Sequence, residues 1–279
     1  MRLGVHLPLK GGFAANLKRV KNYGCETIQI FAGNPTAWKM AAPNHEEINK
    51  RVSLARELSV YPVVIHSAYL INLASRSPDF HEKSISLLDE TMMRASLYGA
   101  PYVVLHVGNH GGAGIEPGLE QVVATISRSL PGWPDGVKLL LENTAGGGTA
   151  LGSSLEELAH VLNSFPKGTL GVCLDTAHGW AAGYDFGSAE GVKEFLEQFE
   201  RCMGLENLCV LHMNDAKVAR GSRVDRHEHI GLGQIGVDGF RELLRQSWAP
   251  EMPAILETPE MGSDWDRRNL EALRSLLQV

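Results

Sequence analysis

The chain contains 279 residues, a length that suits one large α/β domain or two small ones. Hydrophobic residues make up 44% of it and charged residues 21%, so a sizeable core can be buried and wholesale disorder is excluded. The formal charge of −6, from 26 basic and 32 acidic residues, argues on its own against a nucleic-acid binder, because such proteins usually carry a basic excess. Net charge, however, does not show where the charges lie.

The cysteines are scattered and form no Cys-x-x-Cys pair, which argues against a disulfide framework and against a zinc ribbon. We therefore expect Cys25, Cys173, Cys202 and Cys209 to be free thiols in a reducing compartment. The N-terminal residues lack the shape of a signal peptide, and no run approaches the ~20 apolar residues of a membrane helix. The sequence thus predicts a cytoplasmic protein that does not associate with membranes.

Short apolar runs predict strands at eight places, namely 2–7, 27–31, 62–66, 102–106, 137–141, 170–174, 208–212 and 253–256. Several of these runs are apolar almost throughout, which suits parallel strands that are covered on both faces. Helical patterns lie between them, and one begins at a capping box formed by Ser154 and Glu157.

Eight strands alternating with about eight helices, at roughly 35 residues per unit, predict a closed (β/α)8 TIM barrel. No low-complexity linker interrupts the pattern, so we expect a single domain over residues 1–279. An open doubly wound sheet is the alternative, but no Gly-x-Gly-x-x-Gly follows the first strand.

Histidine, aspartate or glutamate stands at or just after the end of each of six consecutive strands, where a TIM barrel carries its reactive residues. These residues are His66, His106, Glu142, Asp175, His178, His212, Asp225, His227 and Glu257. Five imidazoles and four carboxylates that converge on one mouth would be costly to bury without compensating cations. Nitrogen and carboxylate ligands without thiolate suit Zn²⁺, with Mn²⁺ or Fe²⁺ as alternatives, and nine ligands suggest two or three ions.

The other six histidines divide into two groups. His45, His81 and His160 fall in helical patterns, where we expect solvated side chains. The second group lies near the same rim as the ligands, where its members either orient ligands or make local hydrogen bonds: His6, His110 and His229.

The sequence resembles the endonuclease IV family of apurinic/apyrimidinic endonucleases. The resemblance spans almost the whole chain and is carried by the segments 66–73, 141–146, 172–178, 182–185, 211–217, 225–231 and 256–259. Among them are His66-Ser-Ala-Tyr-Leu, Leu-Asp175-Thr-Ala-His178 and Asp225-Arg-His227. The family's fold is a TIM barrel, as the strand count also predicts.

The resemblance implies a cluster of three Zn²⁺ ions and assigns a ligand set to each. It implies that His66 and His106 bind the first ion, that Asp175, His212 and Glu257 bind the second, and that Glu142 bridges these two. The third ion would be bound by His178, Asp225 and His227.

The activity implied by the resemblance is hydrolysis of the phosphodiester 5′ to an abasic site in duplex DNA, which leaves a 3′-hydroxyl and a 5′-deoxyribose phosphate. Removal of 3′-blocking groups is also implied. Paired metals lower the pKa of a shared water, and Glu142 would act as a catalytic ligand that orients the attacking hydroxide. The expected partner is therefore double-stranded DNA with abasic sites or 3′-blocked ends, bound by a monomer.

The resemblance and the local charge also indicate DNA contacts. Tyr69 and Leu70 match intercalating residues of the family, which fill the stack when a nucleotide is extruded. Thr36 stands where the family often has arginine, so we expect Trp38 or Lys39 to take over that role. Basic residues close together after the seventh strand are expected to hold phosphates, namely Lys217, Arg220, Arg223 and Arg226.

Two alternatives stay open. One is a metal-dependent sugar isomerase or epimerase on the same barrel, but such enzymes typically use fewer metals than His178, Asp225 and His227 would add. The other is a DNA-damage binding protein that has lost catalysis, which the complete ligand set argues against. Four of the 32 acidic residues are proposed ligands, and three divalent ions would balance the charge of −6. The acidic composition therefore does not exclude DNA.

Overall fold

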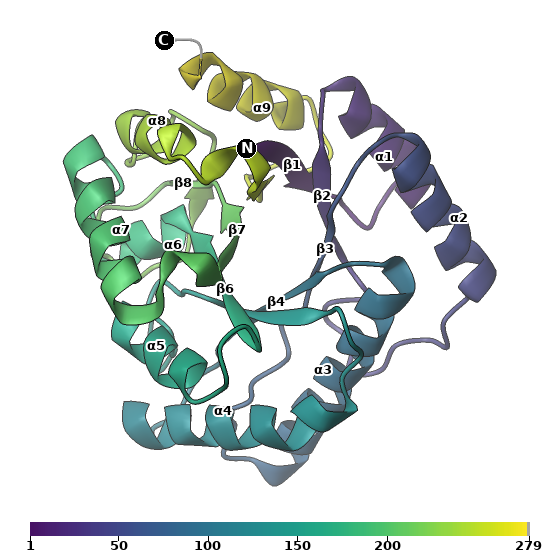
Figure 1. Ribbon diagram of the computed structural model, residues 1–279, viewed down its shortest axis with the longest axis vertical. Helices are drawn as coiled ribbons and strands as arrows, with labels where there is room; N and C mark the ends of the chain where they lie inside the picture. Colours follow the sequence, from purple (N-terminus) through teal and green to yellow (C-terminus); the bar gives the residue numbers. More distant parts are fainter. Residues whose placement is uncertain (278–279) are drawn as a thin grey trace.

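Eight parallel strands close into a barrel in the computed structural model of the protein, which describes residues 1–277. Their order around the barrel follows the sequence, and the last strand, β10, closes the ring by pairing with the first, β1. Figure 1 looks into this ring of strands and shows the helices arranged around it. The predicted (β/α)8 TIM barrel is confirmed, and an open doubly wound sheet is excluded.

The barrel strands match the predicted runs to within one residue at each end. They are β1 (Arg2–His6), β2 (Thr27–Phe31), β3 (Val63–His66), β4 (Tyr102–His106), β5 (Lys138–Glu142), β6 (Leu170–Asp175), β7 (Leu208–His212) and β10 (Pro253–Leu256). Glu142 and Asp175 end their strands rather than follow them, because Glu142 still pairs with Cys173 and Asp175 with His212.

Nine α-helices lie in the described part of the chain, where the sequence predicted about eight. They are α1 (Phe13–Asn22), α2 (His45–Glu57), α3 (Pro78–Tyr98), α4 (Ile115–Ser129), α5 (Leu155–Asn163), α6 (Thr176–Ala182), α7 (Ala189–Met203), α8 (Asp238–Arg245) and α9 (Trp265–Leu276). Single 3-10 turns lie at Leu130–Gly132, Leu205–Asn207 and Ala249–Glu251. The additional helix is α6, which follows β6 directly at the mouth of the barrel, inside the ring position that α7 occupies (Figure 1).

Only half of the capping box predicted at α5 is present, namely the bond to the Ser154 side chain. Ser154 Oγ accepts a hydrogen bond from the Glu157 backbone N–H at 3.2 Å, and the Glu157 carboxylate accepts from the N–H groups of Gly152 and Ser153. The first bond satisfies a backbone donor of the first helical turn, whereas the donors of the other two precede the N-cap. The same residues hold the loop after β5 against the start of the helix.

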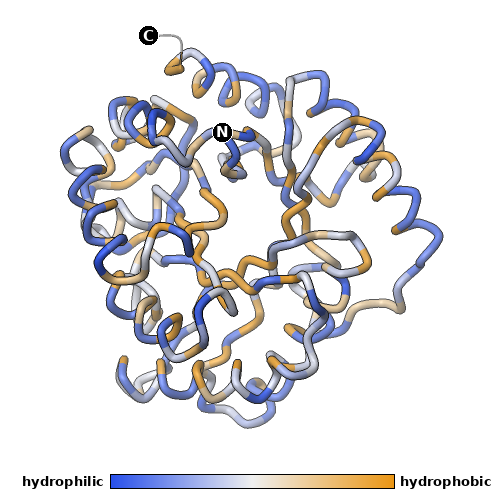
Figure 2. Tube along the Cα trace, viewed as in Figure 1, coloured by the Kyte–Doolittle hydropathy of each residue, from blue (hydrophilic) through white to orange (hydrophobic). Residues whose placement is uncertain are grey.

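Side chains alternate along each strand between the helices and the barrel interior. On β3, Val63 and Ile65 belong to the main core under the helices, whereas Val64 belongs to a separate apolar cluster inside the barrel. The whole interior cluster is Val64, Val104, Leu140, Cys173, Cys209, Val210 and Ile255. Figure 2 shows the hydrophobic segments along the barrel strands and hydrophilic segments along the outer helices. The interior is therefore a packed floor and not a pore.

The four thiols are free, as predicted, and three of them are buried: Cys25, Cys173 and Cys209. Within residues 1–277, none of the helices combines the length and the apolar character that crossing a bilayer requires.

Candidate metal centre

The predicted ligands meet at the carboxyl-terminal mouth because of the two-residue period of the strands. His66 stands two residues beyond Val64, and Glu142 stands two residues beyond Leu140, so each points to the same side as the interior cluster. The same spacing relates His106, Asp175, His212 and Glu257 to interior residues on their own strands. An apolar residue inside the barrel is thus followed, one layer higher, by one of the predicted ligands.

The first group of ligand atoms joins His66, His106 and Glu142. Glu142 Oε2 lies 3.2 Å from His66 Nε2 and 3.0 Å from His106 Nε2. The Nδ1 atom of His66 donates to the Ser67 carbonyl at 2.8 Å, so Nε2 is the ring atom that faces the carboxylate and that a cation would contact.

The second group joins Glu142, Asp175, His212 and Glu257. His212 Nδ1 lies 2.9 Å from Glu142 Oε1, 3.1 Å from Glu257 Oε2 and 3.8 Å from Asp175 Oδ2. Glu142 therefore turns one oxygen to each of the two groups. This division suits a bridging carboxylate.

The third group joins Asp175, His178 and His227, and Asp225 closes it from the loop after β7. Asp225 Oδ2 lies 3.3 Å from His178 Nε2, and Asp225 Oδ1 lies 3.4 Å from His227 Nε2. The Nδ1 atoms of both rings are held by carbonyls, that of Asn143 for His178 and that of Glu257 for His227. All nine predicted ligands thus lie within one connected cluster.

One buried atom shows that these residues fit a cation. The Nε2 atom of His227 is buried and has no hydrogen-bond partner, although it lies 3.6 Å from Asp175 Oδ2. A buried polar atom without a partner is costly, whereas a cation at this point would satisfy the ring and both neighbouring carboxylates. The donor set agrees, because burial raises the pKa of the Cys173 thiol to about 12 and so keeps sulfur protonated beside Glu142 and His212.

The pKa shifts in the cluster show that its carboxylates favour positive charge on their neighbours. Burial alone would lower the pKa of His178, but the carboxylates of Asp175 and Asp225 raise it to about 10. Burial alone would raise the pKa of Asp225, but the hydrogen bond and charge of His178 lower it to about 2. Likewise, the charges of His106 and His212 outweigh burial and hold the pKa of Glu142 well below its ordinary value. Without metal, protons on the rings supply the positive charge that these carboxylates require.

Several groups that support the ligands are amides, and sequence reasoning missed them. Asn214 Nδ2 donates to Asp175 Oδ2 at 2.7 Å, and its Oδ1 accepts from the Glu257 N–H at 2.7 Å. Asn143 Oδ1 accepts from the Asp175 N–H, and its Nδ2 donates to the Asp175 carbonyl. The one available signal was their place, directly after Glu142 and two residues after His212.

The remaining histidines divide as follows. His6 lies against a ligand, with Nδ1 2.9 Å from Glu257 Oε1, whereas His229 stacks on Trp265 and His110 accepts from the Gly114 N–H. His45 and His160 are exposed as predicted. The prediction for His81 was wrong, because its ring is half-buried and its Nε2 lies 2.8 Å from Thr125 Oγ1.

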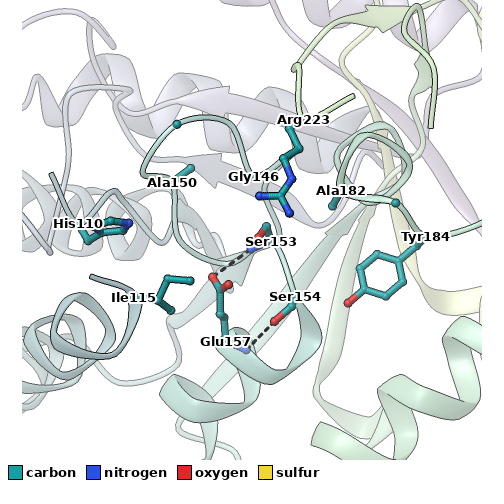
Figure 3. Close-up of a pocket in the computed structure, with 12 residues that line it drawn as sticks. His110, Ile115, Gly146, Ala150, Ser153, Ser154, Glu157, Ala182, Tyr184 and Arg223 are labelled. Carbon is teal, nitrogen blue, oxygen red and sulfur yellow. Dashed lines mark hydrogen bonds between the residues drawn. The ribbon is translucent and has the colours of Figure 1, made fainter. Parts of the chain in front are cut away.

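An open groove leads away from the centre. A cavity of about 440 Å³ lies over the ligands, and it shares Tyr69, His106, His178 and Asp225 with a second cavity of about 300 Å³. The second cavity continues through shared residues, among them Arg223, into a third of about 410 Å³. Figure 3 shows this third cavity, with Arg223 reaching into it above Ser153.

The residues predicted to contact DNA differ in how they meet this groove. Tyr69 is 62% exposed and lines the first two cavities, with its ring 5.2 Å from that of Phe31. Leu70 is half-buried beside it, and Arg226 lines the cavity over the centre. Trp38 packs on Phe80 of α3 at 5.6 Å between ring centroids, and the exposed Lys217 lies in the loop after β7.

A parallel eight-stranded barrel with histidine and carboxylate ligands at its mouth defines a class, the xylose isomerase-like TIM barrels. The model of that family matches residues 17–278, so the chain belongs to it. Within this class the chain is a member of the endonuclease IV family of enzymes. It is 44% identical over 279 residues to the probable endonuclease 4 of Natranaerobius thermophilus, a match that covers 99% of this chain and 98% of the relative.

Solved structures agree with this assignment. The crystal structure of endonuclease IV from Thermus thermophilus matches with a TM-score of 0.86 and 35% identity, covering 100% of this chain and 99% of that one. A D-tagatose 3-epimerase-like protein matches with a TM-score of 0.79 but only 19% identity, covering 100% of this chain and 97% of that one. The second likeness shows a shared fold alone, as expected for a barrel that serves many chemistries.

Proposed function

We propose that the protein is a DNA-repair endonuclease that hydrolyses the phosphodiester 5′ to abasic sites in duplex DNA. The products would be a 3′-hydroxyl and a 5′-deoxyribose phosphate, and the same site would remove 3′-blocking groups. The observation that carries this proposal is the cluster of nine ligands, joined through Glu142 and Asp175, at the floor of an open groove. Membership of the endonuclease IV family supports the choice of substrate.

The cluster suits three Zn²⁺ ions, with Mn²⁺ or Fe²⁺ as alternatives at one or more sites. We assign His66 and His106 to the first ion, Asp175, His212 and Glu257 to the second, and His178, Asp225 and His227 to the third, with Glu142 between the first two. Bound ions of this kind lower the pKa of water and neutralise the charge of a phosphate. All nine ligands come from one chain, which agrees with action as a monomer.

The chain's own residues hold the reacting groups in place. Glu142 is fully buried and reaches both neighbouring groups, so it fixes their separation and can orient water between them. Tyr69 presents an exposed ring at the edge of the cavity over the centre, where it would take the place of the extruded nucleotide together with Leu70. Near Thr36, either Trp38, which packs on Phe80 of α3, or the exposed Lys39 would take over the role of the family's arginine.

Basic side chains along the groove would hold the DNA backbone. Arg226 lines the cavity over the centre, and Arg223 lies where the second and third cavities meet. Among residues 1–277 the Arg223 guanidinium makes no ion pair, so its charge is available for a phosphate. Lys217 is exposed in the same loop.

The test is a nicking assay on a duplex oligonucleotide with one tetrahydrofuran abasic analogue, combined with metal quantitation by mass spectrometry. The expected result is a single cut on the 5′ side of the analogue and three zinc ions per chain. The variant Glu142→Gln should lose more than about 100-fold in cleavage and still bind the duplex, because the groove is intact. A fully metallated wild-type protein that leaves the duplex uncut would contradict the proposal and return attention to a sugar isomerase or a non-catalytic binder.

A further inference from the structure

A fully buried amide side chain, that of Gln29, contacts two residues of the second group inside the barrel. It stands on β2, whereas the ligands stand at the ends of β7 and β10. Its Oε1 lies 2.9 Å from His212 Nε2, and its Nε2 lies 2.6 Å from Glu257 Oε1. No predicted role covers this residue.

The chemistry of Glu257 determines which way the amide faces. An ionised carboxylate only accepts hydrogen bonds, so the amide nitrogen of Gln29 must face Glu257 Oε1 and its carbonyl must face His212. His6 Nδ1 also approaches that oxygen, at 2.9 Å. Glu257 Oε1 is therefore engaged by neighbours, which leaves Oε2, 3.1 Å from His212 Nδ1, for a cation.

The carbonyl of Gln29 in turn determines the tautomer of His212. A carbonyl accepts only, so Nε2 of His212 must carry the proton that it donates. In the neutral ring, Nδ1 then holds the lone pair. This atom is the one that lies 2.9 Å from Glu142 Oε1 within the second group of ligands.

We propose that Gln29 is a positioning residue of the metal centre, which presents His212 Nδ1 and Glu257 Oε2 to the same cation. This inference rests on the proposed metal centre. The amide accepts a hydrogen bond from His212 and donates one to Glu257. Only the orientation that the structure shows allows both bonds. Partners of ligating histidines and carboxylates typically contribute about 10- to 100-fold to metal affinity.

The test is a comparison of zinc affinity between the wild-type protein and Gln29→Met, measured by competition with a chromogenic chelator in the absence of DNA. Methionine keeps the length of the side chain but neither donates to Glu257 nor accepts from His212 with comparable strength. In Gln29→Met, the zinc ion that the chelator removes first should be bound about 10- to 100-fold less tightly than in the wild type. In the zinc-loaded wild type, ¹⁵N shifts of His212 should show a protonated Nε2 and a ligated Nδ1.

The control is Thr27→Val, which replaces another fully buried polar residue on the same strand with an apolar one. Thr27 donates to the Pro62 carbonyl and touches none of the ligands, so its loss should lower stability and leave zinc affinity unchanged. If Gln29→Met does not fold, Gln29→Glu serves instead, since it keeps the shape and the acceptor for His212 but loses the donor to Glu257.

Wild-type zinc affinity in either Gln29 variant, or an unprotonated Nε2 in wild-type His212, would overturn the inference. Because these measurements need no substrate, they are independent of the nicking assay. A wild-type protein that binds zinc as described but cuts no abasic duplex would contradict the proposed function alone.

Discussion

Glu142 connects two groups of predicted ligands at the mouth of the barrel. Its two oxygens belong to different groups of ligands, and its burial is complete, so a shift of its backbone would move both groups together. The residue achieves this from the last position of β5, where pairing with His106 and Cys173 on both sides holds the backbone. The place of Glu142 in the strand ladder therefore matters in addition to its residue type.

The convergence of nine histidine and carboxylate side chains at one mouth could be predicted from the sequence, because these residues stood at equivalent ends of consecutive strands. Their supporting amides could not. Gln29 and Asn214 carry no charge, occur everywhere in proteins, and acquire meaning only when the barrel closes and brings β2 and the loop after β7 against Glu257. Closure of the ring is a property of the whole fold and leaves no local pattern.

Arg223 and Arg220 offer a matched pair in one loop. Arg220 lies 3.3 Å from Asp185 and over the Trp180 ring, whereas Arg223 reaches into the groove without an ion pair among the described residues. We expect Arg223→Gln to weaken binding to an abasic duplex and to reduce the slope of log affinity against log salt concentration by about 1. Fluorescence anisotropy at several salt concentrations measures both. Equal losses for Arg220→Gln would show that the groove position is irrelevant.

At the scale of elements, the loop between β7 and α8 combines two tasks. It carries Asp225 and His227 to the third group of ligands, and it includes the short antiparallel pair β8 (Asp215–Ala216) and β9 (His227–Glu228). Asp215 anchors it, because its buried carboxylate accepts hydrogen bonds from the N–H groups of Ala216, Gly231, Gly233 and Ile235. Asp215 thus ties the start of the loop to the segment that follows β9.

Replacing this anchor should separate folding of the barrel from assembly of the third group. Asp215→Asn places an amide nitrogen against backbone donors, so we expect the free energy of unfolding to fall by about 2–3 kcal/mol. Urea denaturation measures this loss, and metal quantitation should show depletion of the ion assigned to His227. The exposed Asp238, which pairs with Arg241, supplies the control Asp238→Asn. Wild-type stability in Asp215→Asn would contradict the anchoring role.

The elements that sequence reasoning missed are short. The N-cap of helix α6 is Asp175, whose side chain accepts from the His178 N–H at 2.9 Å. The spacing that was interpreted as a pair of ligands is therefore also that of a helix N-cap. The N-cap is confirmed, and the role of the two residues as ligands stays a prediction. The two-residue strands β8 and β9 left no periodic pattern to detect, since periodicity requires several residues.

At the scale of the molecule, the proposed metal ions would compete with protons for one cluster. Without ions, the pKa of His178 is raised to about 10 by its carboxylates, and those of His66 and His212 are raised as well, against the effect of burial. A group whose pKa is higher in the folded state stabilises the fold fully below its unfolded pKa and loses that contribution as the pH rises toward the folded value. Metal binding shows the opposite trend, because it requires unprotonated rings.

We therefore expect the melting temperature of the metal-free protein to fall from about pH 7 to about pH 9, while the increase caused by added zinc grows over the same range. Differential scanning fluorimetry with and without zinc measures both. His178→Gln should reduce the first effect, whereas the exposed His45→Gln should leave it unchanged. A metal-free protein whose melting temperature is independent of pH in this range would contradict the coupling.

The apolar floor of the barrel limits the routes by which water, ions and products can reach or leave the cluster. Six of its seven side chains are completely inaccessible, and they lie one layer below the ligands on the same strands. Water, ions and products therefore have a single entrance, the groove side. A duplex bound in the groove would cover this entrance. Bound DNA should therefore slow the transfer of zinc to a chelator, just as it would exclude solvent from the reacting phosphate.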